Sequence, residues 1–106
     1  MLETKIIVAT DYPRNNTEVK RNEWVSYKIK KVANFEKMLI KQFGGFTKLE
    51  ARGNYLGGPD SLENVLVYTV MTDNGDKAKL FAGIIKEDLF QKEVLYTQHE
   101  TFMEFI

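Results

Sequence analysis

The chain has 106 residues, no cysteine, a hydrophobic fraction of 43% and a charged fraction of 28%. This length and composition predict a single globular domain over residues 1–106 and argue against disorder. The lack of cysteine excludes disulfides, thiolate metal sites and cysteine nucleophiles, and it fits a reducing compartment. Because no stretch approaches the roughly 20 apolar residues of a membrane span, we expect a cytoplasmic protein that does not enter a membrane.

The net charge is zero, but the two halves of the chain carry opposite charges. Residues 1–52 hold 11 Lys and Arg against 6 Asp and Glu, a net +5, whereas residues 53–106 hold 4 against 9, a net −5. If the fold keeps the halves on different surfaces, a basic face could bind an anion or attract another copy of the chain. If neighbouring strands mix the charges, neither effect follows.

A first strand is predicted over residues 3–10, where an unbroken apolar run indicates a central strand that is covered on both faces. A polar connection follows, in which Asn16 or Thr17 could cap the next helix. This connection could also bind an anion at the helix N-terminus, although it contains no glycine-rich cradle. A plain helix cap is the alternative interpretation.

A long amphipathic helix is predicted over residues 17–43, with lysines on a solvated face. The residues expected on its buried arc are Trp24, Val25, Ile29, Val32, Phe35, Leu39, Ile40 and Phe43. Glu36 projects into this arc, where a carboxylate needs a partner or a raised pKa. Glu36 is therefore either a functional group or a residue that a small rotation of the helix exposes.

Gly44 and Gly45 are expected to end this helix, because a helix C-cap favours a positive φ. A second strand is predicted from residue 46 to about residue 52, followed by a long turn-rich connection over 53–64. Long connections are often functional. This one is either a mobile binding loop or a packing arm between subunits, or else a tolerated long turn.

The strongest strand signal covers residues 65–71, and it predicts a second central strand beside the first. A helix over 76–90, a fourth strand over 93–98 and a short fifth strand or arm over 101–106 complete the chain. The resulting order predicts an α+β, ferredoxin-like β-α-β-β-α-β sandwich, with an antiparallel sheet and two helices on one face. Because the other face would meet water, we expect a homo-oligomer that packs sheet to sheet.

Trp24, the junction Phe43-Gly44-Gly45-Phe46-Thr47, the turn Ala51-Arg52-Gly53-Asn54-Tyr55 and the strand over 65–71 resemble a family of small uncharacterised bacterial and phage proteins. That resemblance rests on glycine and aromatic spacing, not on a catalytic signature, and it implies a ferredoxin-like fold. More distantly, the expected topology with its long hairpin loop is similar to trimeric signalling proteins of the PII type, which bind nucleotides in clefts between subunits. An evident nucleotide motif of that family is missing here.

The sequence shows no catalytic constellation, and we predict no catalytic residue, no metal site and no cofactor. The serines Ser26 and Ser61 lack a nucleophile-elbow motif, and a single histidine, His99, excludes a multi-histidine metal site. An enzyme that uses His99 or Glu36 as its base is a third hypothesis. We do not expect nucleic-acid binding, because the basic-aromatic motif of RNA-binding domains is missing and the pI is near 6.6.

Two functions from different classes remain. The first is a non-enzymatic homo-oligomer that binds or sequesters a small anionic or nucleotide-like ligand between subunits, in a regulatory or phage-defence role. Its expected ligand-binding residues are Tyr12, Arg14, Trp24, Arg52, Asn54 and Tyr55. The second is a protein-binding module or inhibitor that acts through a sheet face, an edge strand or the C-terminal arm.

Overall fold

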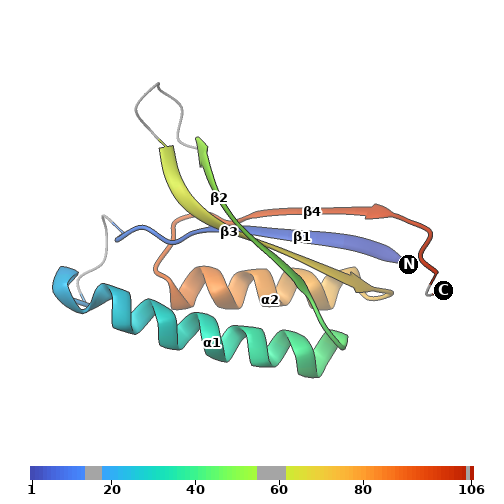
Figure 1. The fold of residues 1–106 in the computed structure, drawn as a ribbon, viewed down its shortest axis with the longest axis horizontal. Helices are drawn as coiled ribbons and strands as arrows, with labels where there is room; N and C mark the ends of the chain where they lie inside the picture. Colours follow the sequence, from blue (N-terminus) through green and yellow to red (C-terminus); the bar gives the residue numbers. More distant parts are fainter. Residues whose placement is uncertain (14–17, 55–61, 105) are drawn as a thin grey trace.

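A computed structural model describes residues 1–13, 18–54, 62–104 and 106 of the chain. The elements in chain order are β1 (Leu2–Ala9), a 3-10 helix η1 (Arg21–Glu23), α1 (Trp24–Phe43), β2 (Thr47–Asn54), β3 (Leu62–Thr72), α2 (Gly75–Asp88) and β4 (Leu95–Glu100). The strands form one antiparallel sheet in the order β2-β3-β1-β4, and α1 and α2 lie on one side of it (Figure 1). This confirms the predicted α+β domain with an antiparallel sheet and two helices in the described part of the chain.

The two strands with the strongest apolar runs, β1 and β3, occupy the centre of the sheet, as predicted. They pair along the whole of β1, from Leu2 opposite Thr72 to Ala9 opposite Val65. Their helix-facing side chains are buried: Thr4, Ile6, Val8, Leu66, Tyr68 and Val70. On the second face Val65 is buried, but Ile7, Val67 and Thr69 are only half-buried, because no described element covers them. The prediction that these strands are covered on both faces is therefore wrong for a single copy of the chain.

The helix α1 starts later than predicted, at Trp24 instead of residue 17. The carbonyl of Val19 accepts a hydrogen bond from the Tyr12 hydroxyl at 2.7 Å, and the Lys20 carbonyl accepts the Glu23 amide in the turn of η1. These bonds hold the chain in place before the regular helix begins. The suggested caps Asn16 and Thr17 lie outside the described residues.

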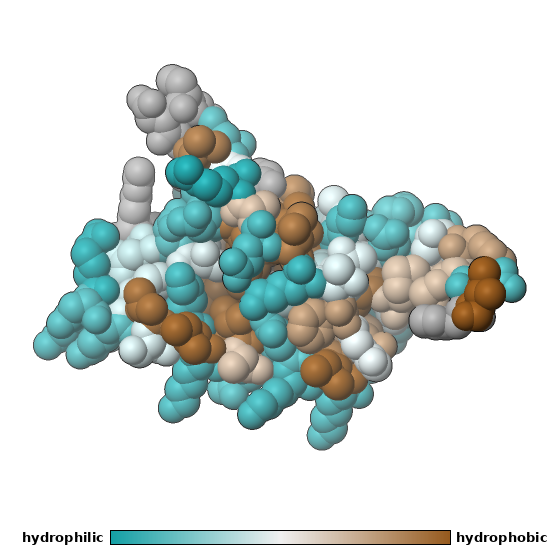
Figure 2. All heavy atoms as spheres, in the orientation of Figure 1, coloured by the Kyte–Doolittle hydropathy of each residue, from teal (hydrophilic) through white to brown (hydrophobic). Residues whose placement is uncertain are grey.

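The helix α1 also buries a narrower stripe than its sequence predicts. Trp24, Phe35 and Leu39 are buried, whereas the expected core residues Val25, Ile29 and Ile40 are 60%, 62% and 55% exposed. α1 packs over β3 and α2, whereas the edge strand β2 starts beside the C-terminal end of α1 and diverges from the helix toward the β2–β3 hairpin end, so β2 does not cover the N-terminal half of α1 (Figure 1). Figure 2 accordingly shows apolar side chains at the surface along α1.

The C-terminal end of α1 and the N-terminal end of α2 have capping residues of the kind that the sequence predicts. Gly44 adopts φ +81° as the C-cap of α1, and its amide bonds to the Ile40 carbonyl at 2.9 Å. Asn74 caps α2, because its side-chain oxygen accepts the Lys77 amide at 3.1 Å. Buried residues of α2 are Ala78, Phe81, Ala82 and Ile85, which form one face of that helix.

Two chain connections differ from expectation. The hairpin strands extend to Asn54 and from Leu62, so only residues 55–61 of the predicted 53–64 connection lie between them, outside the described part. After β4, residues 101–104 form no strand, and the Thr101 amide donates to the Met1 carbonyl at 3.0 Å. The predicted fifth strand is thus wrong for these residues, and the alternative of an arm remains.

The sheet order also decides how the opposite charges of the two halves are distributed. In the order β2-β3-β1-β4, strands from the basic first half alternate with strands from the acidic second half. The charges of the two halves are therefore mixed across the strands of the sheet.

Candidate functional site

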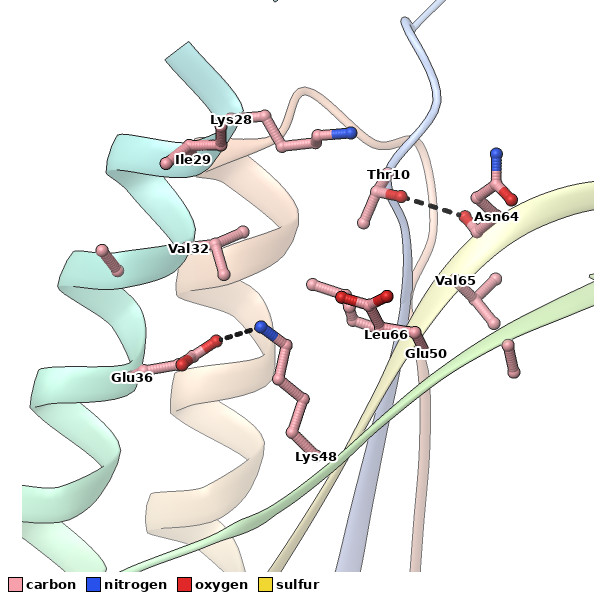
Figure 3. A pocket seen from close by; sticks show the side chains of 12 residues that line it. Thr10, Lys28, Ile29, Val32, Glu36, Lys48, Glu50, Asn64, Val65 and Leu66 are labelled. Atoms are coloured by element: carbon pink, nitrogen blue, oxygen red, sulfur yellow. Dashed lines mark hydrogen bonds and ion pairs between the residues drawn. The ribbon is translucent and has the colours of Figure 1, made fainter. Parts of the chain in front are cut away.

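A cleft of about 470 Å³ opens between α1 and the β2–β3 hairpin, on the helix side of the sheet (Figure 3). We call it the α1–β2 cleft. Polar residues on its walls are Thr10, Lys28, Glu36, Lys48, Glu50 and Asn64. Apolar residues on its walls are Ile29, Val32, Ala33, Ala51, Val65 and Leu66.

The sequence of β2 explains why the cleft stays open. Lys48 and Glu50 are opposite the buried Tyr68 and Leu66 in the sheet register, so they share the helix-facing side of the sheet. Arg52 continues the same alternation and lies opposite Asn64. Charged side chains at these positions are costly to bury, so α1 cannot pack directly on β2. The cleft therefore follows from charges placed where a core strand would carry apolar residues.

At the lower end of the cleft, Glu36 is held by two partners. Its Oε2 atom lies 2.8 Å from Lys48 Nζ, and it accepts a hydrogen bond of 2.7 Å from the Tyr68 hydroxyl. Tyr68 is fully buried, and burial together with the Glu36 hydrogen bond raises the pKa of Tyr68 far above its ordinary value. A rotation of the helix does not expose Glu36, since its side chain is only 23% exposed, and a functional role stays a prediction. Its two partners satisfy the carboxylate, which also compensates the charge of Lys48.

The other end of the cleft is closed by hydrogen bonds between two segments far apart in the sequence. The hydroxyl and the amide of Thr10 both donate to the Asn64 carbonyl, at 3.3 and 2.9 Å. Asp11 accepts from the Asn64 amide at 3.0 Å and from the Asn64 side chain at 2.9 Å. These bonds join the end of β1 to the start of β3.

Lys28 and Glu50 project into the cleft from its opposite walls, Lys28 from α1 and Glu50 from β2 (Figure 3). Neither side chain forms an ion pair or a hydrogen bond with any residue that the structure describes. Because Lys48 is already compensated by Glu36, Lys28 and Glu50 are the charges that a ligand in the cleft would meet.

Two of the predicted ligand-binding residues, Tyr12 and Trp24, form part of the molecule's packing. Trp24 is only 4% exposed, and its indole donates to the Thr10 carbonyl at 2.9 Å. Its ring meets Tyr12 edge-on at 5.8 Å and stacks on Tyr27 at 5.6 Å. Trp24 therefore supports the cleft wall at Thr10 from behind and does not line the cleft.

The other predicted residues divide into two groups. Arg52 and Asn54 are exposed on the helix-facing side of β2, where Arg52 lies opposite the cleft residue Asn64, but neither of them lines the cleft. Arg14 and Tyr55 lie outside the described residues. The structure thus brings Arg52 close to the site, and it adds Lys28 and Glu50, which the sequence analysis missed. The alternation Lys48-Glu50-Arg52 on one strand face was the signal that could have indicated the cleft.

The two residues considered as catalytic bases lie on opposite faces of the sheet. Glu36 is on the helix side, whereas His99 pairs with Glu3 in the register of β4 and β1, on the open side. His99 Nε2 lies 3.6 Å from Glu3 Oε2, and its side chain is 57% exposed. The described residues contain no group of three or more His, Cys, Asp or Glu side chains that could hold a metal ion.

The open face of the sheet carries an apolar row that crosses all strands. In the sheet register Leu49 lies opposite Val67, Val67 opposite Ile7, and Ile7 opposite Leu95. The two outer members, Leu49 and Leu95, are 60% and 46% exposed. We call these four residues the sheet-face row.

Comparisons with known proteins do not add to this geometry. Neither a scan against protein-family models nor a search of curated proteins finds a match for the chain. Among the described residues, neither α1 nor α2 is long and apolar enough to cross a membrane. The candidate site is therefore defined by the residues of the α1–β2 cleft.

Proposed function

We propose that this chain is a non-enzymatic, ferredoxin-like domain that binds a small ligand with an anionic group in the α1–β2 cleft. The fold assignment is supported by the element order β-α-β-β-α-β and by the sheet order β2-β3-β1-β4. The cleft itself carries the functional part of the proposal. Its volume of about 470 Å³ falls within the roughly 300–1,000 Å³ of typical small-molecule sites.

The charges of the cleft indicate which part of it meets the anionic group. Lys48 is compensated by Glu36 at 2.8 Å, which leaves the Lys28 ammonium as the cation on the cleft wall. Arg52 is exposed and lies opposite the cleft residue Asn64 in the sheet, so it adds a second positive charge next to the cleft. An ammonium that lacks a partner in a partly enclosed site attracts a carboxylate or phosphate more strongly than one in bulk water.

Two observations support a binding function over catalysis. The Oε2 atom of Glu36 pairs with Lys48 and accepts the Tyr68 hydroxyl, so contacts within the domain account for the position of this carboxylate without a catalytic role. His99 lies on the opposite face of the sheet, too far from the cleft to act with Glu36 on one substrate. The cleft thus offers recognition groups without an assembled acid–base pair.

An NMR titration with a library of small carboxylates, amino acids and nucleotides tests this proposal. We expect amide shifts that cluster at the cleft residues Val32, Ala51 and Leu66 for at least one class of probe. Lys28→Met should weaken that binding about tenfold, as expected for the loss of a charge-assisted contact. The matched control is Lys30→Met, since Lys30 is exposed on the same helix and does not line the cleft. A library that shifts no cleft amide would refute the proposal.

We also propose self-association through the open sheet face, on the basis of a separate observation. The sheet-face row places four apolar side chains side by side on a face that no described element covers. Contiguous exposed apolar groups are typical of protein interfaces. A homodimer that packs these faces together would leave both clefts open, since each cleft lies on the helix side. A heterologous protein partner is the alternative occupant, and molar-mass measurements over a range of protein concentrations distinguish the two.

A further inference from the structure

We infer that the ligand of the α1–β2 cleft is a zwitterion, with a carboxylate that binds Lys28 and an ammonium that binds Glu50. The inference rests on the proposed small-ligand function and specifies its chemical class. It starts from the placement of the two side chains on opposite walls, one on α1 and one on β2, with both pointing into the space between (Figure 3).

The local charge balance is the first step. Four ionisable side chains line the cleft: Lys28, Glu36, Lys48 and Glu50. The Glu36–Lys48 pair at 2.8 Å is complete in itself and is further fixed by the Tyr68 hydroxyl. One positive and one negative side chain remain, and they do not pair with each other or with another described residue.

The second step compares how different ligands would meet these two charges. A phosphate or dicarboxylate that binds Lys28 brings negative charge toward Glu50, and this repulsion is only partly screened in a cleft. A ligand with a carboxylate and an ammonium compensates both side chains at once. The cleft is thereby selective against polyanions such as nucleotides, which the sequence alone had suggested as ligands.

The third step concerns the part of the ligand between its charges. Apolar side chains of Val32 and Leu66 line the same space, and Ile29, 62% exposed, borders it. Burying aliphatic carbon against them is favourable in proportion to the area removed from water. The geometry therefore favours an aliphatic amino acid, in which a short hydrocarbon chain accompanies the two charged groups.

A series of ω-amino acids from glycine to 6-aminohexanoate, together with L-leucine, tests the inference by NMR titration of the intact chain. Hexanoate and hexylamine serve as probes that keep only one of the two charges. We expect one member of the zwitterion series to bind at least about tenfold more tightly than either singly charged probe, because each charge-assisted contact contributes to affinity.

Charge-removing variants then assign the two contacts. Glu50→Gln should weaken binding of the best zwitterion about tenfold and leave hexanoate unaffected, whereas Lys28→Met should weaken the zwitterion and hexanoate but not hexylamine. The double variant Lys28→Glu with Glu50→Lys should recover much of the zwitterion affinity, because the ligand can bind in the reversed orientation. Lys30→Met is the control for a lysine outside the cleft, and circular dichroism verifies that each variant is folded.

The outcomes distinguish a failure of the zwitterion inference from a failure of the proposed small-ligand function. If hexanoate or inorganic phosphate binds as tightly as every zwitterion and Glu50→Gln changes nothing, the inference is wrong while the cleft remains a ligand site. If neither these probes nor the wider library shift the cleft amides, both proposals fail. If a zwitterion binds more tightly than the singly charged probes, and Glu50→Gln and Lys28→Met have the effects described above, the zwitterion inference is confirmed.

Discussion

Among single residues, Tyr68 joins the core to the candidate site. Its ring is fully buried and meets Phe35 and Phe46 edge-on, and its hydroxyl donates to Glu36 at 2.7 Å. Tyr68→Phe keeps the ring and removes this bond to a charged acceptor. We expect the free energy of unfolding to fall by about 1.5 kcal/mol in urea denaturation.

Tyr27→Phe provides the comparison for this variant. The Tyr27 hydroxyl donates at the same distance, 2.7 Å, but to the uncharged Asp88 carbonyl. Hydrogen bonds to ionised acceptors are stronger than those to neutral ones. Tyr27→Phe should therefore lower the free energy of unfolding by less than Tyr68→Phe. Equal losses in the two variants would show that the charge of Glu36 does not strengthen its bond to Tyr68.

The raised pKa of Tyr68 leads to a prediction of how the stability of the fold depends on pH. Burial, the hydrogen bond to Glu36 and the nearby carboxylates raise the pKa of Tyr68 far above the ordinary value near 10. Above about pH 10 the unfolded chain loses this proton while the folded chain keeps it, so the unfolded state binds fewer protons and stability falls as pH rises. Between about pH 9 and about pH 11, the free energy of unfolding of the wild type should fall by about 1.4 kcal/mol more than that of Tyr68→Phe. Urea denaturation at both pH values measures this difference, and parallel losses would contradict it.

The residues of the site show how far sequence alone reaches. The sequence predicts Tyr12 and Trp24 as ligand-binding residues, yet Trp24 belongs to the core cluster and Tyr12 packs against it. Lys28 and Glu50 are 22 positions apart, and they face each other only because α1 and β2 lie on either side of the cleft. Helical periodicity places Lys28 near the edge of the apolar arc, but it cannot tell which strand lies opposite.

Among the elements, α1 shows both the success and the limit of pattern analysis. Its C-terminus could be predicted, because Gly44 adopts the positive φ that glycine tolerates best. The buried stripe of α1 could not be predicted in full. Val25, Ile29 and Ile40 fit the helical period, but in the described part of the chain no neighbouring element covers them. Periodicity indicates which residues share a face of a helix, whereas burial depends on the packing of the whole sheet.

Two glycines in helical contexts give a matched pair of predictions for these elements. Gly44→Ala places a Cβ at φ +81°, which should lower the free energy of unfolding by about 1 kcal/mol. Gly83 lies inside α2, where an added Cβ would have no described atom within 4 Å apart from the adjacent residues and backbone of its own helix. Gly83→Ala should raise the stability by about 0.5–1 kcal/mol, because alanine loses less backbone entropy in a helix. Thermal denaturation followed by circular dichroism measures both, and a destabilising Gly83→Ala would contradict this account.

For the whole molecule, the two faces of the sheet have different roles in our proposals. The helix side carries the core and the α1–β2 cleft, whereas the open side carries the sheet-face row. The sequence indicated this division, because the apolar runs of β1 and β3 extend to both faces although the chain has helices for only one. A ligand site and a self-association surface can therefore coexist in one small domain.

The self-association proposal gives the last prediction. Leu49→Lys and Leu95→Lys place charges at the two ends of the sheet-face row, where the side chains are 60% and 46% exposed, so neither change should unfold the domain. If two sheet faces pack together, each variant should raise the dimer dissociation constant at least about tenfold, or about 1.4 kcal/mol. Leu80→Lys is the control, since Leu80 is 64% exposed but lies on α2, on the other side of the sheet. Light scattering coupled to gel filtration, from about 10 µM to about 1 mM protein, measures the shift. A monomer at every concentration, or an equal effect of Leu80→Lys, would leave the open face without a second copy and favour a heterologous partner.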